Sequence, residues 1–231
     1  MLSPSSLRSI FQWTNQQCQL CRLPLGDNET VWCRHCMARF PQPPYCARCG
    51  TTTLKSTDQC GSCLSAPPPW QQFYRLGEYD FPLRQLIHQL KFGGKFWLAE
   101  PLGQLLAQHI SHPAPVIIPV PLHPLRRLYR SFNQSTLLAQ AIARETGSLC
   151  LPNAIHRTRN TQAQRQLSKS ERKKNLHQAF ILKTKALPEH VAIVDDVLTT
   201  GSTVAELTRL LLQAGVKQVD VYCICYTPVI K

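Results

Sequence analysis

No stretch of this sequence is long and apolar enough to cross a membrane as a helix. The longest apolar run, residues 116–122, is short and contains Pro119 and Pro121, whereas a membrane-spanning helix needs about 20 apolar residues. The first 13 residues contain one arginine and no continuous apolar stretch, and no small-residue cleavage site follows, so they do not resemble a secretory signal. We therefore expect a protein that does not span a membrane and is cytoplasmic, where thiols stay reduced.

Acidic residues are scarce in the chain. Against 26 Lys and Arg there are only 13 Asp and Glu, which gives a formal net charge of +13. Residues 121–185 alone contain 13 Lys and Arg and two Asp and Glu, a net charge of +11. This concentration of positive charge indicates an anionic ligand or partner. Because 43% of the residues are hydrophobic, a folded core is expected and disorder is excluded as the main state.

Eight of the eleven cysteines fall in the first 63 residues, as four Cys-x-x-Cys pairs. Two such turns complete a tetrahedral tetrathiolate site, so four pairs predict two zinc sites, structural because four thiolates close each one. A redox motif is normally one pair beside a βαβ unit, and the ferredoxin run of closely spaced cysteines is absent from the sequence. Sequential pairing is favoured over a crossed arrangement of alternate pairs. The predicted ligands are Cys18, Cys21, Cys33 and Cys36 for one zinc and Cys46, Cys49, Cys60 and Cys63 for the other.

A proline-rich segment separates the cysteine pairs from the rest of the chain. Residues 66–70 read Ala-Pro-Pro-Pro-Trp, and such a run favours polyproline II and cannot extend a helix. We therefore expect a double zinc-ribbon domain over residues 1–66. Residues 67–231 alternate helical and strand-like patterns, which predict an α/β domain with a mostly parallel sheet flanked by helices. Its last strand, over residues 219–227, is expected at or near the sheet edge.

The most informative segment joins an apolar strand, two carboxylates and a hydroxyl-rich loop. Residues 191–194 predict a buried parallel strand, and residues 203–214 predict a helix. Ligands of open α/β sheets bind at the carboxyl ends of strands, and a helix N-terminus holds phosphate. Two adjacent carboxylates would repel a second phosphate and suit ribose hydroxyls or a magnesium ion. The segment predicts a ribose 5-phosphate site formed by Asp195, Asp196, Thr199, Thr200, Gly201, Ser202 and Thr203.

A second strand–loop–helix unit carries cations where the first carries anions. Residues 117–121 predict a strand that ends in a proline-locked turn, and residues 133–146 predict a helix. Between them lie Arg126, Arg127 and Arg130, whose guanidinium groups offer forked donors to phosphate oxygens. A solvated basic surface is the alternative interpretation of these arginines.

Taken together, these motifs resemble two known patterns. Asp-Asp followed by Thr-Thr-Gly-Ser-Thr is similar to the 5-phosphoribosyl-1-pyrophosphate (PRPP) motif of type I phosphoribosyltransferases, whereas the Gly-Lys-Ser/Thr of a P-loop is missing. The whole chain resembles the ComF/GntX family, which is associated with competence and with the use of extracellular DNA. The family motifs are the cysteine pairs, the Pro-Pro-Pro-Trp linker, Leu-Lys-Phe-Gly-Gly at residues 90–94, Pro-Val-Pro-Leu-His-Pro at 119–124 and Phe-Asn-Gln at 132–134. Ser131 stands where the family usually has glycine.

The resemblance implies PRPP, or another ribose 5-phosphate ligand, bound with magnesium. Asp195 and Asp196 would be the catalytic pair, and the three arginines above would bind pyrophosphate. Three functions compete. The first is transfer of ribose 5-phosphate from PRPP with release of pyrophosphate, a glycosyltransferase reaction of the pentosyl class. The second is binding of single-stranded DNA, with proteins of the DNA-uptake machinery as partners, and the third is a non-catalytic regulator that senses PRPP.

The segment over residues 157–175 is polar and basic, a composition typical of a mobile loop or a solvated helix. The resemblance implies a loop that closes over PRPP and excludes water. The same side chains also suit the phosphates of a nucleic acid. The residues assigned to this loop or to DNA contact are Arg157, Gln164, Arg165, Arg172, Lys173 and Lys174.

Lys91 and several aromatic residues have two interpretations each. Lys91 follows an amphipathic helical pattern and either reaches the ligand or is solvated. The aromatic residues either stack on bases or serve the core or a domain interface. They are Trp70, Phe73, Tyr74, Phe96 and Trp97.

Overall fold

The computed structural model describes residues 17–40, 42–122, 132–158, 179–184 and 186–227. The chain divides into two compact units, residues 1–40 and residues 41–231. The first group of four cysteines lies in the smaller unit and the second group in the larger one. The domain boundary expected between residues 66 and 67 concerns independent folding and stays a prediction.

Over its described residues, 17–40, the smaller unit consists of turns and one short helix, α2 (Arg34–Met37). Backbone hydrogen bonds close its first turn, where the Cys18 amide donates to the Leu23 carbonyl over 2.8 Å. Trp32 packs on Phe40 with ring centroids 5.0 Å apart. So small an apolar cluster cannot hold a fold alone, and such units normally depend on a metal or on disulfides.

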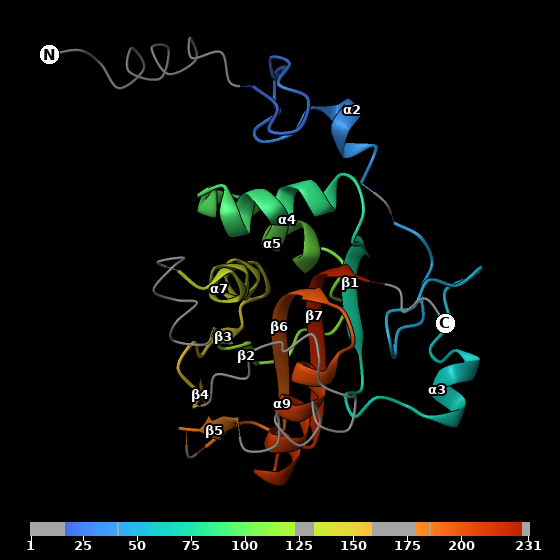
Figure 1. Cartoon of the computed structure of the whole chain (residues 1–231), viewed down its shortest axis with the longest axis vertical. Helices are drawn as coiled ribbons and strands as arrows, with labels where there is room; N and C mark the ends of the chain where they lie inside the picture. Colours follow the sequence, from blue (N-terminus) through green and yellow to red (C-terminus); the bar gives the residue numbers. More distant parts are fainter. Residues whose placement is uncertain (1–16, 41, 123–131, 159–178, 185, 228–231) are drawn as a thin grey trace, which may run out of the picture. The chain divides into compact units, whose positions relative to one another are not determined.

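The larger unit is organised around a five-stranded sheet in the order β1-β7-β6-β2-β3, in which every pair of neighbours is parallel (Figure 1). The strands are β1 (Phe73–Glu78), β2 (Val116–Pro119), β3 (Leu149–Cys150), β6 (His190–Leu198) and β7 (Gln218–Tyr226). A separate antiparallel pair consists of β4 (Ile155–Arg157) and β5 (Phe180–Leu182). The predicted mostly parallel sheet is confirmed.

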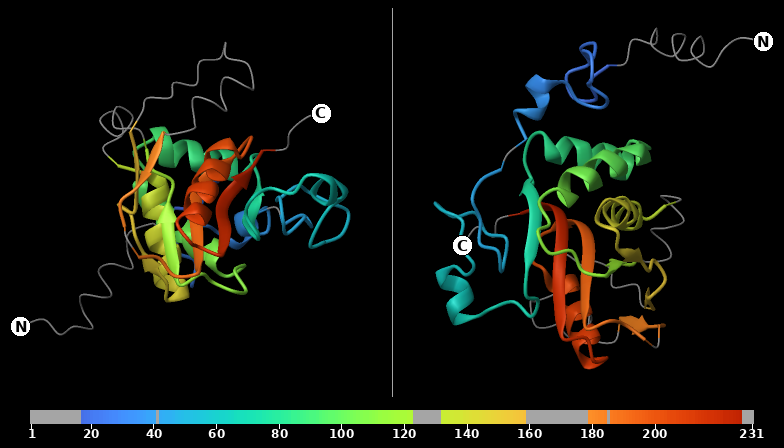
Figure 2. Two further views of the ribbon diagram at one scale, coloured as in Figure 1. Left: turned by 90° about the horizontal axis from the view of Figure 1, so that it is seen from below. Right: turned by 180° about the vertical axis from the view of Figure 1, so that it is seen from behind.

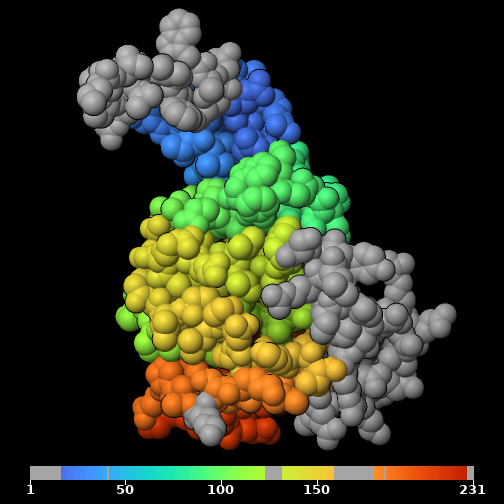
Figure 3. Space-filling view, turned by 90° about the vertical axis from the view of Figure 1, so that its left-hand side faces the viewer, coloured from blue at the N-terminus to red at the C-terminus, as the bar shows by residue number. Residues whose placement is uncertain are grey.

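Helices cover both faces of this sheet. They are α4 (Leu83–Phe92), the short 3-10 helix η1 (Phe96–Leu98), α5 (Ala99–Ala107), α7 (Gln134–Thr146) and α9 (Ser202–Gln213). Helix α9 and the β4–β5 pair cover one face, where Val191 and Ile193 pack into a core cluster with Leu207 and Phe180. Helices α5 and α7 pack on each other and on the strands from the opposite side (Figure 2). Figure 3 shows the yellow surface that includes α7 next to the green surface that includes α4. Successive side chains of a strand point to opposite faces of the sheet, so each strand contributes apolar groups to the core on both faces.

Strand β7 lies one position in from the sheet edge, between β1 and β6. The alternating pattern of residues 219–227 predicted a position at or near the sheet edge, and β7 lies next to the edge strand. In the structure every residue of β7 after Gln218 is buried, because α5 contacts one side of the strand and α9 packs beside it. The edge belongs to β1, the first strand in the chain.

The second cysteine group, at residues 46–63, precedes β1 and packs beside it (Figure 2). Isolated bridges join Tyr45 to Thr52 and Cys46 to Thr57, and the helix α3 (Gly61–Ser65) completes the segment. The aromatic side chains predicted either to stack on bases or to be buried divide into two groups. Trp70, Phe73 and Tyr74 are buried, which supports the core role for them.

Among the helices that the structure describes, none has the length and the apolar character required to cross a membrane.

Candidate functional site

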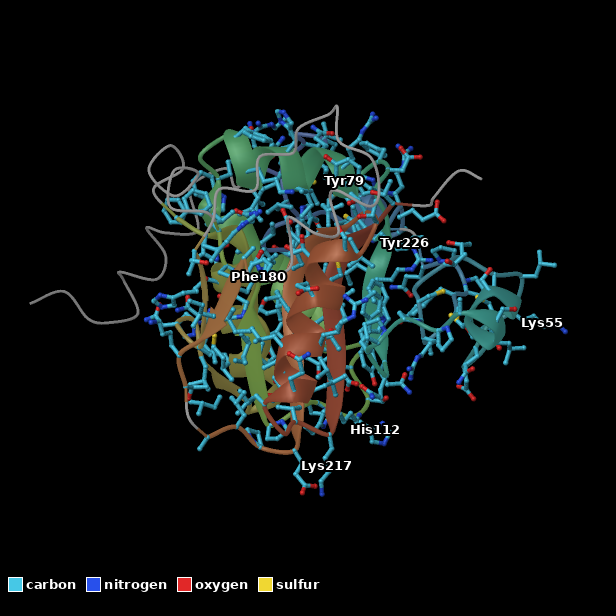
Figure 4. All side chains as sticks on the ribbon, turned by 60° about the horizontal axis from the view of Figure 1, so that its bottom comes forward. Lys55, Tyr79, His112, Phe180, Lys217 and Tyr226 are labelled. Carbon is cyan, nitrogen blue, oxygen red and sulfur yellow. The ribbon has the colours of Figure 1, made fainter. Side chains whose placement is uncertain are left out.

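The two adjacent carboxylates lie toward the carboxyl end of β6. The strand was expected to end at residue 194, but it continues to Leu198 because Asp195 and Val197 keep their pairing with β7. Each carboxylate accepts a hydrogen bond from the backbone amide of the following residue, over 2.9 Å in both cases. Figure 4 shows this end of the sheet at Tyr226, the last residue of β7, with Lys217 at the opposite end.

Asp195 is held by the N-terminus of α7. The Ser135 hydroxyl donates to Asp195 Oδ1 over 3.0 Å, and Ser135 itself is buried. The helix begins there because the Asn133 side chain caps it, accepting from the Ser135 amide over 3.0 Å. Burial raises the pKa of Asp195 to about 6, although Lys91 and the Ser135 hydroxyl favour the charged form. This carboxylate is therefore poised to gain a cation or hydroxyl donors from a ligand.

Asp196 is paired with Lys91. The Lys91 ammonium lies 2.5 Å from Asp196 Oδ2, and the two side chains are 19% and 5% exposed. Lys91 is in the last turn of α4, which ends at Phe92. The two interpretations of Lys91 were ligand contact and simple solvation. The structure instead gives Lys91 a carboxylate partner within the predicted site, so a ligand that reaches Asp196 also meets this cation.

The hydroxyl-rich loop connects β6 to α9 in three residues. Thr199, Thr200 and Ser202 are exposed to solvent, and the Thr200 and Ser202 hydroxyls lie 3.0 Å apart. Gly201 precedes the helix with a φ of 68°, a left-handed conformation that glycine adopts at little cost. The first amides of α9 have no partner inside the helix, and the helix dipole adds a partial positive charge there. The loop, which begins three residues after Asp196, therefore presents hydroxyl groups to solvent beside a helix N-terminus, a combination that suits a phosphate.

The remaining residues predicted for the site fall into two groups. Arg157 lies on β4 with its guanidinium 5.6 Å from the centre of the Phe180 ring. It lines a cavity of about 490 Å³ between α7 and β4, together with Asn133 and His156. The other predicted residues lie outside the part of the chain that the structure describes. They are Arg126, Arg127, Arg130, Gln164, Arg165, Arg172, Lys173 and Lys174.

Ser135 is the site residue that the sequence analysis missed. Its place next to a helix cap was visible in the sequence, but its contact with Asp195 depends on the packing of α7 beside β6. Of the aromatic residues predicted either to stack on bases or to be buried, Phe96 and Trp97 are 55% and 50% exposed. Their rings are 5.6 Å apart, so this pair keeps its interpretation as a stacking surface.

The cysteines form two groups in the predicted sequential order. In each group the four sulfur atoms lie within 4.8 Å of one another. Backbone amides also point at sulfur: Cys33 donates to Cys18 Sγ over 3.4 Å, and Cys60 donates to Cys46 Sγ over 3.2 Å. Converging thiols with amide donors fit a tetrahedral zinc ion. We name the two groups the first tetrad (Cys18, Cys21, Cys33 and Cys36) and the second tetrad (Cys46, Cys49, Cys60 and Cys63).

The chain is similar to several known proteins. The family model "Phosphoribosyl transferase domain" matches residues 135–229, a range that contains β6, the hydroxyl-rich loop, α9 and all of α7 except its first residue. The DNA utilization protein YhgH of Shigella flexneri is 41% identical over 219 residues, which cover 91% of this chain and 96% of the relative. Competence protein F of Haemophilus influenzae is 36% identical over 224 residues, covering 92% and 98%. A solved allosteric regulatory enzyme of purine biosynthesis has a TM-score of 0.39 and 23% identity, covering 54% of this chain and 25% of that one.

Proposed function

Because the chain belongs to the ComF/GntX family and contains a phosphoribosyltransferase domain, we propose that it binds PRPP at the carboxyl end of β6. The observation that carries the proposal is the order of groups along one strand, loop and helix. Two carboxylates, Asp195 and Asp196, precede an exposed hydroxyl loop, and the loop leads into the N-terminus of α9. A sugar phosphate is a ligand with hydroxyl groups at one end and a phosphate at the other, which matches this order.

In the proposed complex the 5-phosphate accepts hydrogen bonds from the first amides of α9 and from the hydroxyls of Thr199, Thr200, Ser202 and Thr203. The ribose hydroxyls donate to Asp195 and Asp196. Asp195 is already oriented by Ser135, so binding requires little rearrangement of that carboxylate. The Lys91 ammonium offsets the negative charge that Asp196 would otherwise present to an anionic ligand.

Magnesium is proposed to bind together with PRPP, and the carboxylates of Asp195 and Asp196 are the described groups that suit it. Bound magnesium supplies positive charge that neutralises the phosphates. Arg126, Arg127 and Arg130 are proposed to hold the pyrophosphate through forked hydrogen bonds. Catalysis of phosphoribosyl transfer would then rest on positioning and on stabilising positive charge at C1 of the ribose.

The test is calorimetric titration of the zinc-loaded protein with PRPP and magnesium. Thr200→Val and Ser202→Ala should each weaken binding about tenfold, because each removes a hydrogen bond to a charged phosphate. Ser148→Ala is the matched control, since Ser148 lies beside the start of β3 and bonds only locally to Thr146. Equal losses in all three variants, or no binding by the unaltered protein, would refute the proposal.

A pyrophosphate-release assay distinguishes an enzyme from a sensor. The protein that binds PRPP is incubated with magnesium and candidate acceptors, which are free bases and single-stranded DNA. Release of pyrophosphate supports a phosphoribosyltransferase of the pentosyl class. Binding without release supports a non-catalytic PRPP-sensing regulator instead.

Single-stranded DNA binding is the second proposed function. It is favoured by the net charge of +11 over residues 121–185 and by the exposed rings of Phe96 and Trp97. Basic groups hold the phosphates of a single strand and aromatic rings stack on its bases. The names of the relatives from Shigella flexneri and Haemophilus influenzae refer to DNA utilization and competence. We accordingly propose a cytoplasmic role beside the proteins of DNA uptake.

If PRPP and DNA bind at different sites, a substitution at one site should weaken the binding of one ligand only. Asp195→Ala and Asp196→Ala should weaken PRPP binding and leave the affinity for an unlabelled oligonucleotide unchanged. Replacing Arg172, Lys173 and Lys174 with alanine should weaken DNA binding and flatten its dependence on salt. If the carboxylate variants lose DNA binding to the same degree, the two ligands share one site.

A further inference from the structure

We propose that the second tetrad positions the hydroxyl-rich loop (residues 199–201), called the phosphate-binding loop below after its proposed role. Trp70 is the positioning residue through which the second tetrad acts on this loop. The proposal rests on the PRPP site proposed above and adds a dependence of that site on one of the two predicted zinc ions. Three contacts carry it. They join the turn between Cys46 and Cys49 to Trp70, Trp70 to Gly201, and the rest of the cysteine segment to the end of β7.

The first contact holds the indole of Trp70 on the turn between Cys46 and Cys49. The Trp70 Nε1 donates to the Arg48 carbonyl over 2.7 Å, and Arg48 lies between these two cysteines. The Arg48 guanidinium in turn donates to the carbonyls of Pro68 and Gln71, over 3.1 and 3.2 Å. The turn therefore forms hydrogen bonds with the backbone on both sides of Trp70 and with the Trp70 side chain.

The neighbouring residues reinforce this contact. The Phe73 amide donates to the Ala47 carbonyl over 2.7 Å, so both residues between Cys46 and Cys49 bond to the chain that leads into β1. A Cβ atom at Gly50 would lie 2.4 Å from the Phe73 ring. The backbone of the second tetrad thus lies against the ring of Phe73 with no room for a side chain.

The second contact joins Trp70 to the phosphate-binding loop. Trp70 is 5% exposed and belongs to the same core cluster as Leu198 and Val204, which flank the loop. A Cβ atom at Gly201 would lie 3.0 Å from Trp70 Cη2. Gly201 immediately precedes the first turn of α9. The indole therefore packs against the backbone whose amides are proposed to bind phosphate.

The third contact is an independent route to the same loop. The Thr51 hydroxyl lies 3.0 Å from the Tyr226 hydroxyl, and the Arg75 guanidinium lies 4.9 Å from the Tyr45 ring centre and 5.6 Å from that of Tyr226. At the same end of β7, the Thr227 amide donates to the Leu198 carbonyl over 2.8 Å, and Leu198 ends β6 directly before the loop.

Metal loss is expected to disturb these contacts because the cysteine segment has little apolar support of its own. Leu54 and Leu64 are 99% and 73% exposed, so thiolate–metal bonds have to supply the folding free energy of this segment. Without a metal the Arg48 carbonyl loses its fixed position. The buried Nε1 of Trp70 is then left without an acceptor, which favours movement of the indole away from Gly201.

The first tetrad provides the matched control, because it belongs to the other compact unit. The experiment compares Cys60→Ser with Cys36→Ser in the full-length protein. Zinc content by mass spectrometry should fall from two ions to one in each variant. PRPP affinity with magnesium, measured by calorimetry, should fall about tenfold in Cys60→Ser only, as expected when one buried hydrogen bond no longer holds the loop.

Hydrogen exchange of the amides at residues 199–204 gives a readout that needs no ligand. Exchange there should be about tenfold faster in Cys60→Ser than in Cys36→Ser or the unaltered protein. Trp70→Phe, which keeps a ring and removes the donor, should retain both zinc ions and a cooperative thermal unfolding transition. It should nevertheless speed exchange at these amides and weaken PRPP binding.

These outcomes separate the two proposals. If the unaltered protein does not bind PRPP, the proposed function fails. The hydrogen-exchange data then still test whether the second tetrad positions the loop. Unchanged exchange at residues 199–204 in both Cys60→Ser and Trp70→Phe would overturn the coupling. An equal effect of Cys36→Ser and Cys60→Ser on exchange or on affinity would also overturn it.

Discussion

The ammonium of Lys91 lies 2.5 Å from Asp196 Oδ2, which joins the end of α4 to the carboxyl end of β6. Asp196 is 4% exposed, and a carboxylate so deeply buried is strongly unfavourable without a compensating charge. The pair therefore stabilises the site before any ligand arrives. It also places a lysine beside the groups proposed to bind ribose.

Removing this cation should destabilise the protein. Lys91→Met is expected to lower the free energy of unfolding by about 2 kcal/mol at pH 8, because it leaves Asp196 charged and unpaired in a buried position. The double variant Lys91→Met with Asp196→Asn should recover most of this loss. Urea unfolding followed by circular dichroism measures both values.

An exposed ion pair of the same length serves as the control for that prediction. The Lys217 ammonium lies 2.5 Å from Glu189 Oε1, and both side chains are more than 70% exposed. Lys217→Met should change the stability by about 0.5 kcal/mol or less, since solvent screens such pairs. A loss of stability as large as that of Lys91→Met would mean that burial of Asp196 is not the cause.

The stability contributed by Asp195 should depend on pH. Burial raises its pKa to about 6 in the folded protein from an ordinary value of 3.8. The folded state therefore binds the proton more tightly, and stability is lost as the pH rises from about 4 to about 6. Asp195→Asn carries no such charge, so it should be more stable than the unaltered protein at pH 8, by up to about 3 kcal/mol, since one pKa unit corresponds to about 1.4 kcal/mol.

The measurement is the difference in unfolding free energy between the unaltered protein and Asp195→Asn at a series of pH values from 4 to 8. Taking the difference removes the contribution of groups that the two proteins share, the cysteines included. A difference that does not change with pH would contradict the raised pKa of Asp195.

Ligand binding should require glycine at position 201 for two reasons. One is the left-handed backbone conformation, and the other is the lack of room for a side chain beside Trp70. Gly201→Ala places a side chain at a φ of 68° and within 3.0 Å of the Trp70 ring. Gly147→Ala is matched in backbone, with a φ of 71° and nothing within 4 Å of the new Cβ. Both should lose about 1 kcal/mol of stability from the left-handed conformation, but only Gly201→Ala should weaken PRPP binding in calorimetric titrations. Equal PRPP affinity of the two variants would contradict a tight fit between Trp70 and the loop.

Phe96 and Trp97 should contribute to binding of single-stranded DNA. Replacing both with alanine should reduce the affinity for a fluorescent oligonucleotide about tenfold, because stacking contributes about 1–3 kcal/mol for each base. The slope of affinity against salt should stay the same, since no charge is removed. Leu149→Ala, at an exposed residue of β3, is the control, and an equal loss in this variant would show that the effect is not stacking.

Several features followed from local sequence patterns because their causes are local. Closely spaced cysteines predicted two tetrads in sequential order, and the structure groups them so. The helix predicted over residues 133–146, with Gly147 closing it, begins one residue later in the structure, at Gln134, and ends at Thr146. Its cap and its left-handed closing glycine are both present. The helix after the hydroxyl loop was predicted within one residue at each end. The carboxyl end of β6 was harder to predict, because pairing with β7 continues the strand past the apolar run.

Local sequence patterns were thus enough to identify the strand, the loop, the helix and the two groups of four cysteines, since each depends on residues that lie close together in the sequence. The partners of those groups are set by packing between distant segments: Ser135 on Asp195, Lys91 on Asp196 and Trp70 under Gly201. The pairing of β1 with β7 at the sheet edge is of the same kind, because the alternating pattern of β7 does not reveal which strand pairs with it. Contacts between distant segments depend on how whole helices and strands pack, and no short stretch of sequence contains that information.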